Sequence, residues 1–152
     1  GCRACEAAMN KMGFKFSPDE EIVCVTENDA CGVDAVQIIT GCTFGKGNLI
    51  YRGTGKMAFS FFNRLNGQSL RIVLKTLPQE MEREERQHYI LNCALEDLFE
   101  FKEPHYDLPG KARIFTSIAC ENCQEAASQN KMRLQDNKIV CLDCFEDYSR
   151  GW

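Results

Sequence analysis

The first half of the chain mixes helical and strand-like spacing of apolar side chains. Residues 2–12 repeat apolar positions every three to four residues, which predicts a helix that ends at Gly13. The β-branched run 22–25 predicts a buried strand. The apolar stretch 35–40 predicts a second helix, which ends at Gly41. Helices and strands therefore share the same part of the chain, as they do in α+β domains.

Three more strands are expected after residue 48. Segments 49–52 and 57–63 are rich in strand formers, and Gly53-Thr54-Gly55-Lys56 between them is typical of a hairpin turn. The dipeptide Asn66-Gly67 predicts another turn, which precedes a strand at 70–74. Strands joined by short turns favour antiparallel pairing. We therefore expect an α+β fold in which an antiparallel sheet is packed with helices.

A long helix is expected next. Thr76-Leu77-Pro78-Gln79 matches a capping box, with Thr76 as the N-cap and Gln79 as the third helical residue. Apolar residues then recur at three-to-four spacing as far as Leu98. This spacing predicts one continuous helix with an apolar face.

The chain changes character after residue 103. The segment 104–110 holds two prolines and a glycine, which predicts a domain boundary. We expect a core domain in residues 1–110 and a smaller domain in residues 111–152. The smaller domain contains two C-x-x-C pairs separated by seventeen residues, formed by Cys120, Cys123, Cys141 and Cys144.

This cysteine spacing is typical of a tetrathiolate zinc site. Two cysteines separated by two residues can turn both sulfurs toward one ion, and two such knuckles complete a closed tetrahedral shell. We predict one structural Zn²⁺ in a treble-clef or zinc-ribbon-like finger, and a closed structural site implies no catalysis by itself. The spacing leaves open an iron–sulfur cluster on the same thiolates, and also two local redox or disulfide pairs.

Composition narrows the class of protein. A chain with 44% hydrophobic and 26% charged residues is typical of a globular protein. No apolar run approaches the roughly 20 residues needed to span a bilayer, and the N-terminus lacks a signal-peptide pattern, so we expect a cytoplasmic protein without a membrane partner. The net charge of −4 argues against a general nucleic-acid-binding surface. Ten cysteines in such a chain indicate metal ligation or thiol chemistry rather than disulfides.

Two cysteines of the core domain flank the helix predicted at 35–40. Cys31 and Cys42 would lie at its opposite ends, with Asp34 and Lys46 adding charge nearby. The glycine-rich loop that holds Lys46 would let backbone N–H groups approach a ligand closely. Taken alone, these residues favour the simpler interpretation that both cysteines are small buried hydrophobes.

A resemblance to a known family changes this interpretation. The stretch 29–49, DACGVDAVQIITGCTFGKGNL, resembles the central signature of the FmdE family of formylmethanofuran dehydrogenase components. The segment Gly1-Cys2-Arg3-Ala4 resembles the end of that family's N-terminal motif. Many members carry an HxHxCPG-type segment just before this motif, and the present sequence begins after it. The double C-x-x-C tail resembles the zinc-finger appendage of some members.

The resemblance implies an α+β core that forms a homodimer and holds a metal site in a cleft. At the matching positions it points to Cys31, Asp34, Cys42 and Lys46 as candidate catalytic or metal-binding residues, with a second transition metal at the core site. In a dimer, the ligands need not come from one chain. In the complete enzyme of this family, the molybdenum or tungsten chemistry belongs to other polypeptides. The resemblance therefore implies an accessory or metal-handling protein for a redox enzyme.

Two other classes of function stay open. A regulatory or interaction module would use the finger to bind a partner, including nucleic acid through Lys131, Arg133 and Lys138. The net charge of −4 makes nucleic acid the less favoured partner. A self-contained enzyme would need a nucleophile with an adjacent base, and the sequence displays no pair of that kind.

Overall fold

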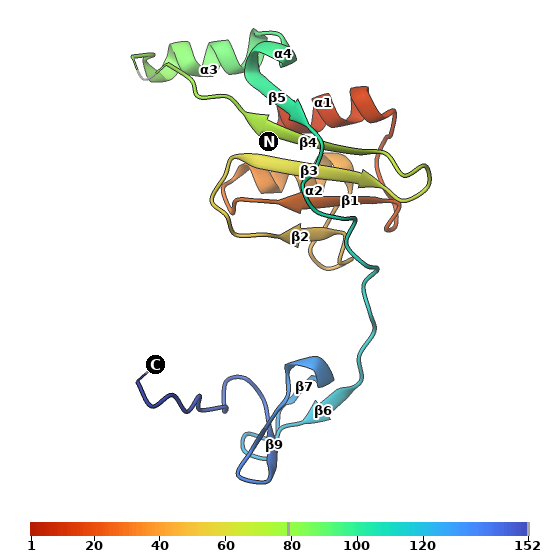
Figure 1. Ribbon diagram of the computed structural model, residues 1–152, viewed down its shortest axis with the longest axis vertical. Coiled ribbons are helices and arrows are strands. Elements are labelled where there is room, and N and C mark those ends of the chain that lie inside the picture. The colour runs from red at the N-terminus through yellow and green to blue at the C-terminus, as the bar shows by residue number, and fades with distance from the viewer. Residues whose placement is uncertain (79, 152) are drawn as a thin grey trace. The chain divides into compact units, whose positions relative to one another are not determined.

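The computed structural model describes residues 1–78 and 80–151, which group into two compact units, residues 1–112 and the residues from 113 onward (Figure 1). We call them the core unit and the finger unit. The predicted role of Gln79 in a capping box lies outside the described residues. No helix among the described residues has the length and apolar character that crossing a bilayer requires.

The core unit contains four helices and five strands among its described residues. In chain order they are α1 (Cys2–Met12), β1 (Ile22–Thr26), α2 (Gly32–Thr40), β2 (Leu49–Tyr51), β3 (Ala58–Asn63), β4 (Ser69–Leu74), α3 (Arg83–Asn92), α4 (Leu95–Leu98) and β5 (Phe99–Lys102). The first two helices end where the glycines predict. Gly13 has φ 66° and Gly41 has φ 74°, a left-handed conformation that glycine adopts without strain.

The five strands form one mixed sheet in the order β2-β1-β3-β4-β5. Strands β1 and β2 pair in parallel, whereas the other three pairings are antiparallel. The predicted hairpin between β2 and β3 is therefore wrong, because β1 lies between them. The physical reason is that α2 connects β1 to β2 as a crossover helix, so that β2 runs in the same direction as β1 and pairs with it. The turn predicted at Asn66-Gly67 does join the antiparallel strands β3 and β4.

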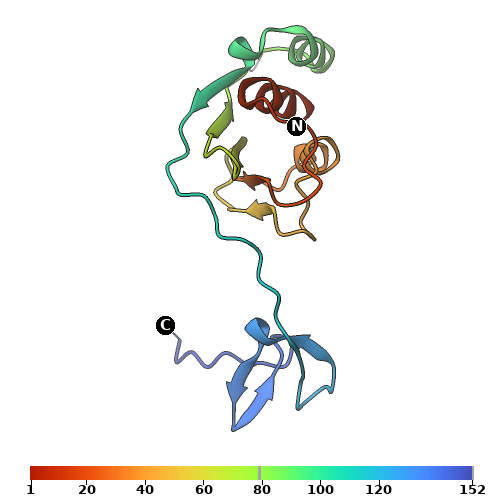
Figure 2. The ribbon, with the colours of Figure 1, turned by 90° about the vertical axis from the view of Figure 1, so that its right-hand side faces the viewer.

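The sheet has a helical face and a rear face, and side chains alternate between them along each strand as the pleat requires. Helices α1 and α2 lie on the helical face (Figure 2). On β3, Phe59 and Phe61 enter the core under these helices, whereas Phe62 packs with Val23 and Val25 on the rear face. Strand β1 is buried along its whole length, so both faces of the sheet are covered there.

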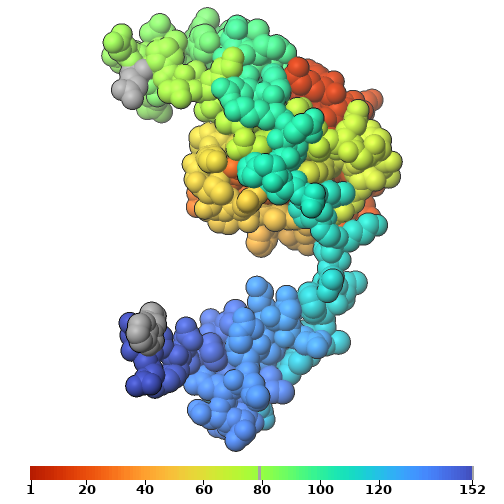
Figure 3. Space-filling model, viewed as in Figure 1, coloured from red at the N-terminus to blue at the C-terminus, as the bar shows by residue number. Residues whose placement is uncertain are grey.

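The cover of the rear face is the segment 104–110, which we call the rear strap. It crosses the surface of the core unit after β5 (Figure 3). The Tyr106 hydroxyl donates to Ser60 Oγ at 2.7 Å, and the Tyr106 ring packs against Phe62. Arg64 donates to the carbonyl oxygen of Pro109 at 2.8 Å. These contacts attach the strap to β3 and to the turn that follows it.

The rear face also buries an ion pair. Arg71 of β4 donates to both carboxylate oxygens of Glu27, at 2.7 Å from Nε and 3.1 Å from the second guanidinium nitrogen. The exposed fractions of the two side chains are 8% and 1%. The Arg71 hydrogen bonds lower the pKa of Glu27, and the same bonds raise the pKa of Arg71. A paired, bidentate geometry is what allows both charges to be buried.

Acidification should therefore lower the free energy of unfolding, because it protonates Glu27. Its pKa is lower in the folded state, so its stabilisation is present above the unfolded carboxyl pKa of about 4.3 and is lost as pH falls through the folded value. Urea unfolding between neutral pH and pH 3 should show a decline in the free energy of unfolding that is shallower in the double variant E27Q/R71M. The exposed-residue variant Glu84→Gln serves as the control. Identical declines in all three proteins would contradict the prediction.

The predicted long helix is broken. Helix α3 begins after Glu82, not after Thr76, and ends before Cys93, which has an extended backbone with ψ 161°. The Arg3 guanidinium of α1 donates to the Cys93 carbonyl oxygen, an acceptor that a continued helix would use internally. Leu98 of the short α4 reaches the core, whereas Leu91 of α3 stays 58% exposed. Strand β5 follows directly, although the spacing of apolar residues gives no sign of it.

The finger unit consists of short strands and a single turn of 3₁₀ helix. Its elements are β6 (Ser117–Ala119), β7 (Ala126–Ser128), η1 (Gln129–Lys131), β8 (Arg133–Gln135) and β9 (Lys138–Val140). Strands β8 and β9 form a hairpin, and its turn residues Asp136 and Asn137 both have positive φ. Asn and Asp tolerate this conformation better than other non-glycine residues.

Candidate functional site

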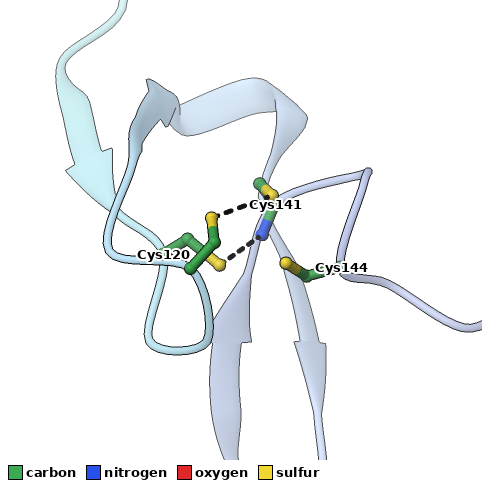
Figure 4. Close-up of side chains that lie close together, drawn as sticks. Cys120, Cys141 and Cys144 are labelled. Atoms are coloured by element: carbon green, nitrogen blue, oxygen red, sulfur yellow. Dashed lines mark hydrogen bonds between the residues drawn. The ribbon is translucent and has the colours of Figure 1, made fainter.

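Four cysteines of the finger unit meet at one point. The Sγ atoms of Cys120, Cys123, Cys141 and Cys144 all lie within 4.8 Å of one another. Figure 4 shows the thiols of Cys120, Cys141 and Cys144 in this cluster. The Sγ atoms of Cys123 and Cys141 are 3.9 Å apart. A tetrahedral zinc with Zn–S bonds of about 2.3 Å requires sulfurs about 3.8 Å apart, so the cluster has the size that zinc needs.

The two knuckles are built by local backbone hydrogen bonds. At the first, the Gln124 N–H donates to the Cys120 carbonyl at 2.9 Å, and Gln124 has φ 65°. At the second, the Cys144 N–H donates to the Cys141 carbonyl at 3.2 Å. Strand β9 brings the knuckles together, because the Cys141 N–H at its end donates to Cys120 Sγ at 3.3 Å. Each C-x-x-C pair thus turns its sulfurs inward.

The four thiols lie close enough to change one another's pKa values. Backbone N–H groups of Cys123 and Cys141 lower the pKa of Cys120 to about 6, which favours one thiolate. The neighbouring thiols of Cys141 and Cys123 raise the pKa of Cys144 to about 12, which opposes a second thiolate nearby. A divalent metal ion at the centre would stabilise four thiolates together. The donor set of four sulfurs in a closed arrangement fits zinc, which would be held by all four cysteines.

A second candidate site lies at the carboxyl ends of the parallel strands β1 and β2. This is the edge at which α/β units usually bind ligands. A pocket of about 260 Å³ opens there, and we call it the Cys31 pocket. It is lined by Thr26, Asn28, Asp29, Ala30, Cys31, Val33, Asp34, Phe44, Leu49 and Tyr51. All but three of these residues belong to the 29–49 stretch singled out in the sequence.

The Cys31 pocket combines acidic, aromatic and thiol groups. Asp29 and Asp34 are exposed, and neither forms an ion pair within the part of the chain that the structure describes. The rings of Phe44 and Tyr51 are 74% and 53% exposed. Cys31 is exposed at the N-terminal end of α2. Unpaired carboxylates beside open aromatic faces favour a cationic ligand with a flat apolar part.

The structure brings Cys31 and Asp34 together but places Cys42 and Lys46 elsewhere. Nine-residue α2 separates Cys31 from Cys42, a span of about 14 Å at 1.5 Å per residue. Cys42 is fully buried in the core, where its Sγ donates to the Ile22 carbonyl at 3.4 Å. Lys46 Nζ donates to the Ser17 carbonyl at 2.8 Å and so attaches its loop to the segment before β1. Neither residue lines the Cys31 pocket.

No second metal cluster accompanies the finger within residues 1–78 and 80–151. Among them, the finger cysteines are the one group of three or more His, Cys, Asp or Glu residues whose ligand atoms lie close enough for one ion. The expectation of a transition metal shared by Cys31, Asp34 and Cys42 has no support from this geometry. Within the described part of this one chain, the Cys31 pocket does not group three such ligand atoms around one point.

Alkylation should distinguish the two candidate cysteines. Burial raises the pKa of Cys42, as it does for its core neighbours Cys24 and Cys5, the latter to about 11. Since the thiolate is the reactive form, iodoacetamide at neutral pH should label Cys31 and leave Cys42 unmodified in the folded protein. Peptide mapping by mass spectrometry measures both sites, and labelling in urea provides the control. Native labelling of Cys42 as fast as Cys31 would contradict this assignment.

Several residues of the Cys31 pocket are not evident from the sequence. Phe44 and Tyr51 do not stand out, because an isolated aromatic residue carries no positional signal. Asn28 makes the turn that leads to α2, where its Oδ1 accepts from the Ala30 N–H at 3.2 Å. The tendency of asparagine to form such Asx turns was the one feature of the sequence that could have pointed to Asn28. The N-cap of α2 is Cys31, and no side-chain hydrogen bond caps the helix there.

Comparison with known proteins identifies the family. Residues 1–103 match the model of the family described as FmdE, molybdenum formylmethanofuran dehydrogenase operon. The chain belongs to the FmdE family. Residues 113–150 match the prokaryotic dksA/traR C4-type zinc finger. The four-cysteine cluster of the finger unit is thus a zinc site, and this protein is a zinc-binding FmdE-family protein.

Two individual proteins are similar to this FmdE-family chain. One is a protein of Archaeoglobus fulgidus that is described as a probable S-adenosyl-L-methionine-binding protein. The two sequences are 36% identical over an alignment of 180 residues, which covers 97% of the present chain. The chain spans about half (48%) of that curated relative. A crystal structure of a tungsten formylmethanofuran dehydrogenase FmdE-like protein from Syntrophus aciditrophicus superposes with a TM-score of 0.60 and 26% identity. That match covers 81% of this chain and 70% of the other.

Proposed function

We propose that this FmdE-family protein is a zinc-bearing accessory protein that holds a small organic cation in the Cys31 pocket on behalf of a redox enzyme. The observation that carries the proposal is the make-up of that pocket. Asp29 and Asp34, which form no ion pair with any residue that the structure describes, line the same opening as the exposed rings of Phe44 and Tyr51. This combination complements positive charge and a flat ring in one ligand.

S-adenosylmethionine is the natural first probe of this pocket. Its sulfonium centre carries a positive charge and its adenine offers a flat aromatic face. The A. fulgidus relative is described as a probable S-adenosyl-L-methionine-binding protein. That description supports the choice of probe, since the relative aligns with 97% of this chain.

Calorimetric titration of the full chain tests the ligand. S-adenosylmethionine should bind several-fold more tightly than S-adenosylhomocysteine, which lacks the sulfonium charge, because exposed charge pairs contribute about 0.2–1 kcal/mol each. The variant Asp34→Asn should lose this preference, whereas Asp107→Asn on the rear strap should keep it. Equal binding of the two compounds, or none of either, would overturn the proposed ligand. A transition metal that is retained through Cys31 would do the same and would favour a metal site.

The accessory role is supported by the family's own description and by the description of the Syntrophus neighbour. Both name a formylmethanofuran dehydrogenase, of the molybdenum and the tungsten type respectively. A purified enzyme of this class that lacks its FmdE component provides the test. Under the proposal, the full chain co-elutes with it in size-exclusion chromatography. Separate elution at micromolar concentrations of both proteins would count against the role.

We further propose that the protein acts as a homodimer. Light scattering should give twice the chain mass of 17.3 kDa, and a monomer at the same concentration would reject this part of the proposal.

The finger supports a second candidate function, an interaction module. Its match to the dksA/traR C4-type finger is the observation that favours it. From residue 113 onward there are five basic and six acidic side chains, so the finger has no excess of positive charge. A nucleic-acid partner therefore has little electrostatic support. Salt-dependent retention of the full chain on a nucleic-acid column would favour that partner, and passage at low salt would remove it.

A further inference from the structure

The Cys31 pocket depends on a loop that has no regular structure of its own. Residues 27–31, which we call the pocket loop, join β1 to α2 and supply Asn28, Asp29, Ala30 and Cys31 to the pocket wall. A loop of this kind holds its shape only through specific contacts, because no ladder or helix constrains it. The origin of those contacts therefore decides how well the pocket is formed.

The contacts converge on Glu27 at the base of the loop. Its carboxylate accepts two hydrogen bonds from Arg71 of β4, and it accepts a third from Thr54 Oγ1 at 2.9 Å. Its N–H donates to the Ala58 carbonyl at 3.0 Å, and its carbonyl accepts from the Gly55 N–H at 2.8 Å. One residue thus attaches the pocket loop to three separate segments of the core unit.

The next residue carries the attachment into the pocket. Asn28 Nδ2 donates to the Lys56 carbonyl at 3.2 Å, and the Thr26 hydroxyl donates to the Asn28 carbonyl at 2.6 Å. The Asn28 Oδ1 atom also accepts a hydrogen bond from the Ala30 N–H. The direction in which Cys31 leaves the loop therefore depends on where Glu27 holds the start of this turn.

We propose that the buried Glu27–Arg71 ion pair is a positioning pair for the Cys31 pocket. This inference rests on the proposed function, since it takes that pocket as the ligand site. A buried ion pair is a weak source of stability, because apolar residues of similar volume can often replace it without loss. Such a replacement removes the two hydrogen bonds between Arg71 and Glu27, and it also removes the acceptor of the Thr54 hydroxyl. These bonds fix the orientation of Glu27. The pair fixes the pocket loop relative to β4 and the 53–56 turn.

A double variant separates positioning from stability. In E27M/R71M, flexible apolar side chains fill the space of the ion pair and leave no unpaired buried charge. We expect a melting temperature close to that of the wild type. Amide hydrogen exchange of residues 28–33 should become about tenfold faster, because the loop opens more often. The affinity for S-adenosylmethionine should fall about tenfold, because the side chains of the loop are no longer held in the binding geometry. Glu96→Gln, which removes an exposed ion pair with Lys11, is the control and should change neither quantity.

The two readouts keep this inference distinct from the proposed function. If the wild type does not bind S-adenosylmethionine, the proposed ligand is wrong, yet faster exchange of residues 28–33 in the double variant would still support the positioning role. Wild-type exchange of those amides in a folded double variant would overturn it. If the double variant does not fold, Thr54→Val and Arg71→Lys take its place. Each removes part of the Glu27 network and should accelerate the same amides several-fold, and unchanged exchange in both would reject the inference.

Discussion

Removal of zinc should unfold the finger of this protein and leave the FmdE-family core folded. The finger buries only a small apolar cluster, in which Val140 packs with the ligands Cys120 and Cys141. Leu134 and Ile139 of its hairpin stay 73% and 42% exposed. So small a core cannot offset the conformational entropy of the segment. The bound metal has to supply the difference, and structural zinc contributes about 10–16 kcal/mol in finger peptides at neutral pH.

Two-dimensional NMR of the full chain during titration with a chelator measures this effect. Amide signals of the β8–β9 hairpin should collapse to random-coil positions, whereas those of β1 and β3 should stay in place. The variant Cys120→Ser should show the same collapsed finger without chelator, and Cys2→Ser, which changes an exposed cysteine of the core unit, should show none of it. A finger that keeps its dispersed signals without metal would show that zinc is not what folds it.

Replacement of Phe61 by alanine should have the largest effect on the core unit. Phe61 is the largest fully buried side chain among the described residues, and it belongs to the core cluster on the helical face, where its ring centroid lies 6.1 Å from that of Phe14. Deleting a buried phenyl ring removes its transfer free energy and leaves a cavity, at a cost of about 3–5 kcal/mol. For a unit of this size, the melting temperature should fall by about 10–20 °C.

Phe44→Ala is the matched control for this prediction, because the Phe44 ring is 74% exposed and its loss should change stability by at most about 0.5 kcal/mol. Calorimetry measures the melting temperatures of the wild type, Phe61→Ala and Phe44→Ala, and the zinc content of each protein is measured alongside. Zinc content should be the same in all three, since the finger cysteines lie in a separate compact unit. A Phe61→Ala protein that melts at the wild-type temperature would show that the core is not organised around this ring.

Local signals in the sequence predicted local structure well. Gly13 and Gly41 end α1 and α2, as their freedom to adopt positive φ predicts. The β8–β9 turn likewise holds Asp136 and Asn137, residue types that turns favour. These features depend on neighbours a few residues away, and the sequence displays those neighbours directly.

Long-range pairing escaped prediction for a physical reason. The parallel partnership of β1 with β2 depends on α2 packing back onto the sheet, and nothing in residues 49–51 distinguishes a parallel edge strand from a hairpin strand. The break of the expected helix at Cys93 depends on Arg3, ninety residues earlier in the chain. Strand β5 follows the four-residue α4 and pairs with β4, a partner that lies about thirty residues earlier in the chain.

The candidate site divides in the same way. The C-x-x-C spacing was enough to indicate a metal cluster, since the spacing itself sets the geometry. The family resemblance pointed to Cys31, Asp34, Cys42 and Lys46 as one set. The structure places Cys31 and Asp34 at one pocket, Cys42 in the core and Lys46 on a loop, and the sequence does not display this separation. Glu27 was missed entirely, because a single acidic residue after a strand gives no sign that its partner, Arg71, lies on β4.

The central proposal is that the finger holds the one zinc ion of this protein, whereas the core pocket takes an organic ligand and no metal. Metal analysis by mass spectrometry on the full chain, purified without added metal, tests it most directly. The account predicts one zinc per chain in the wild type and in Cys31→Ser, and none in the double variant C120S/C123S. A second metal equivalent that survives loss of the finger cysteines and disappears with Cys31→Ser would contradict it.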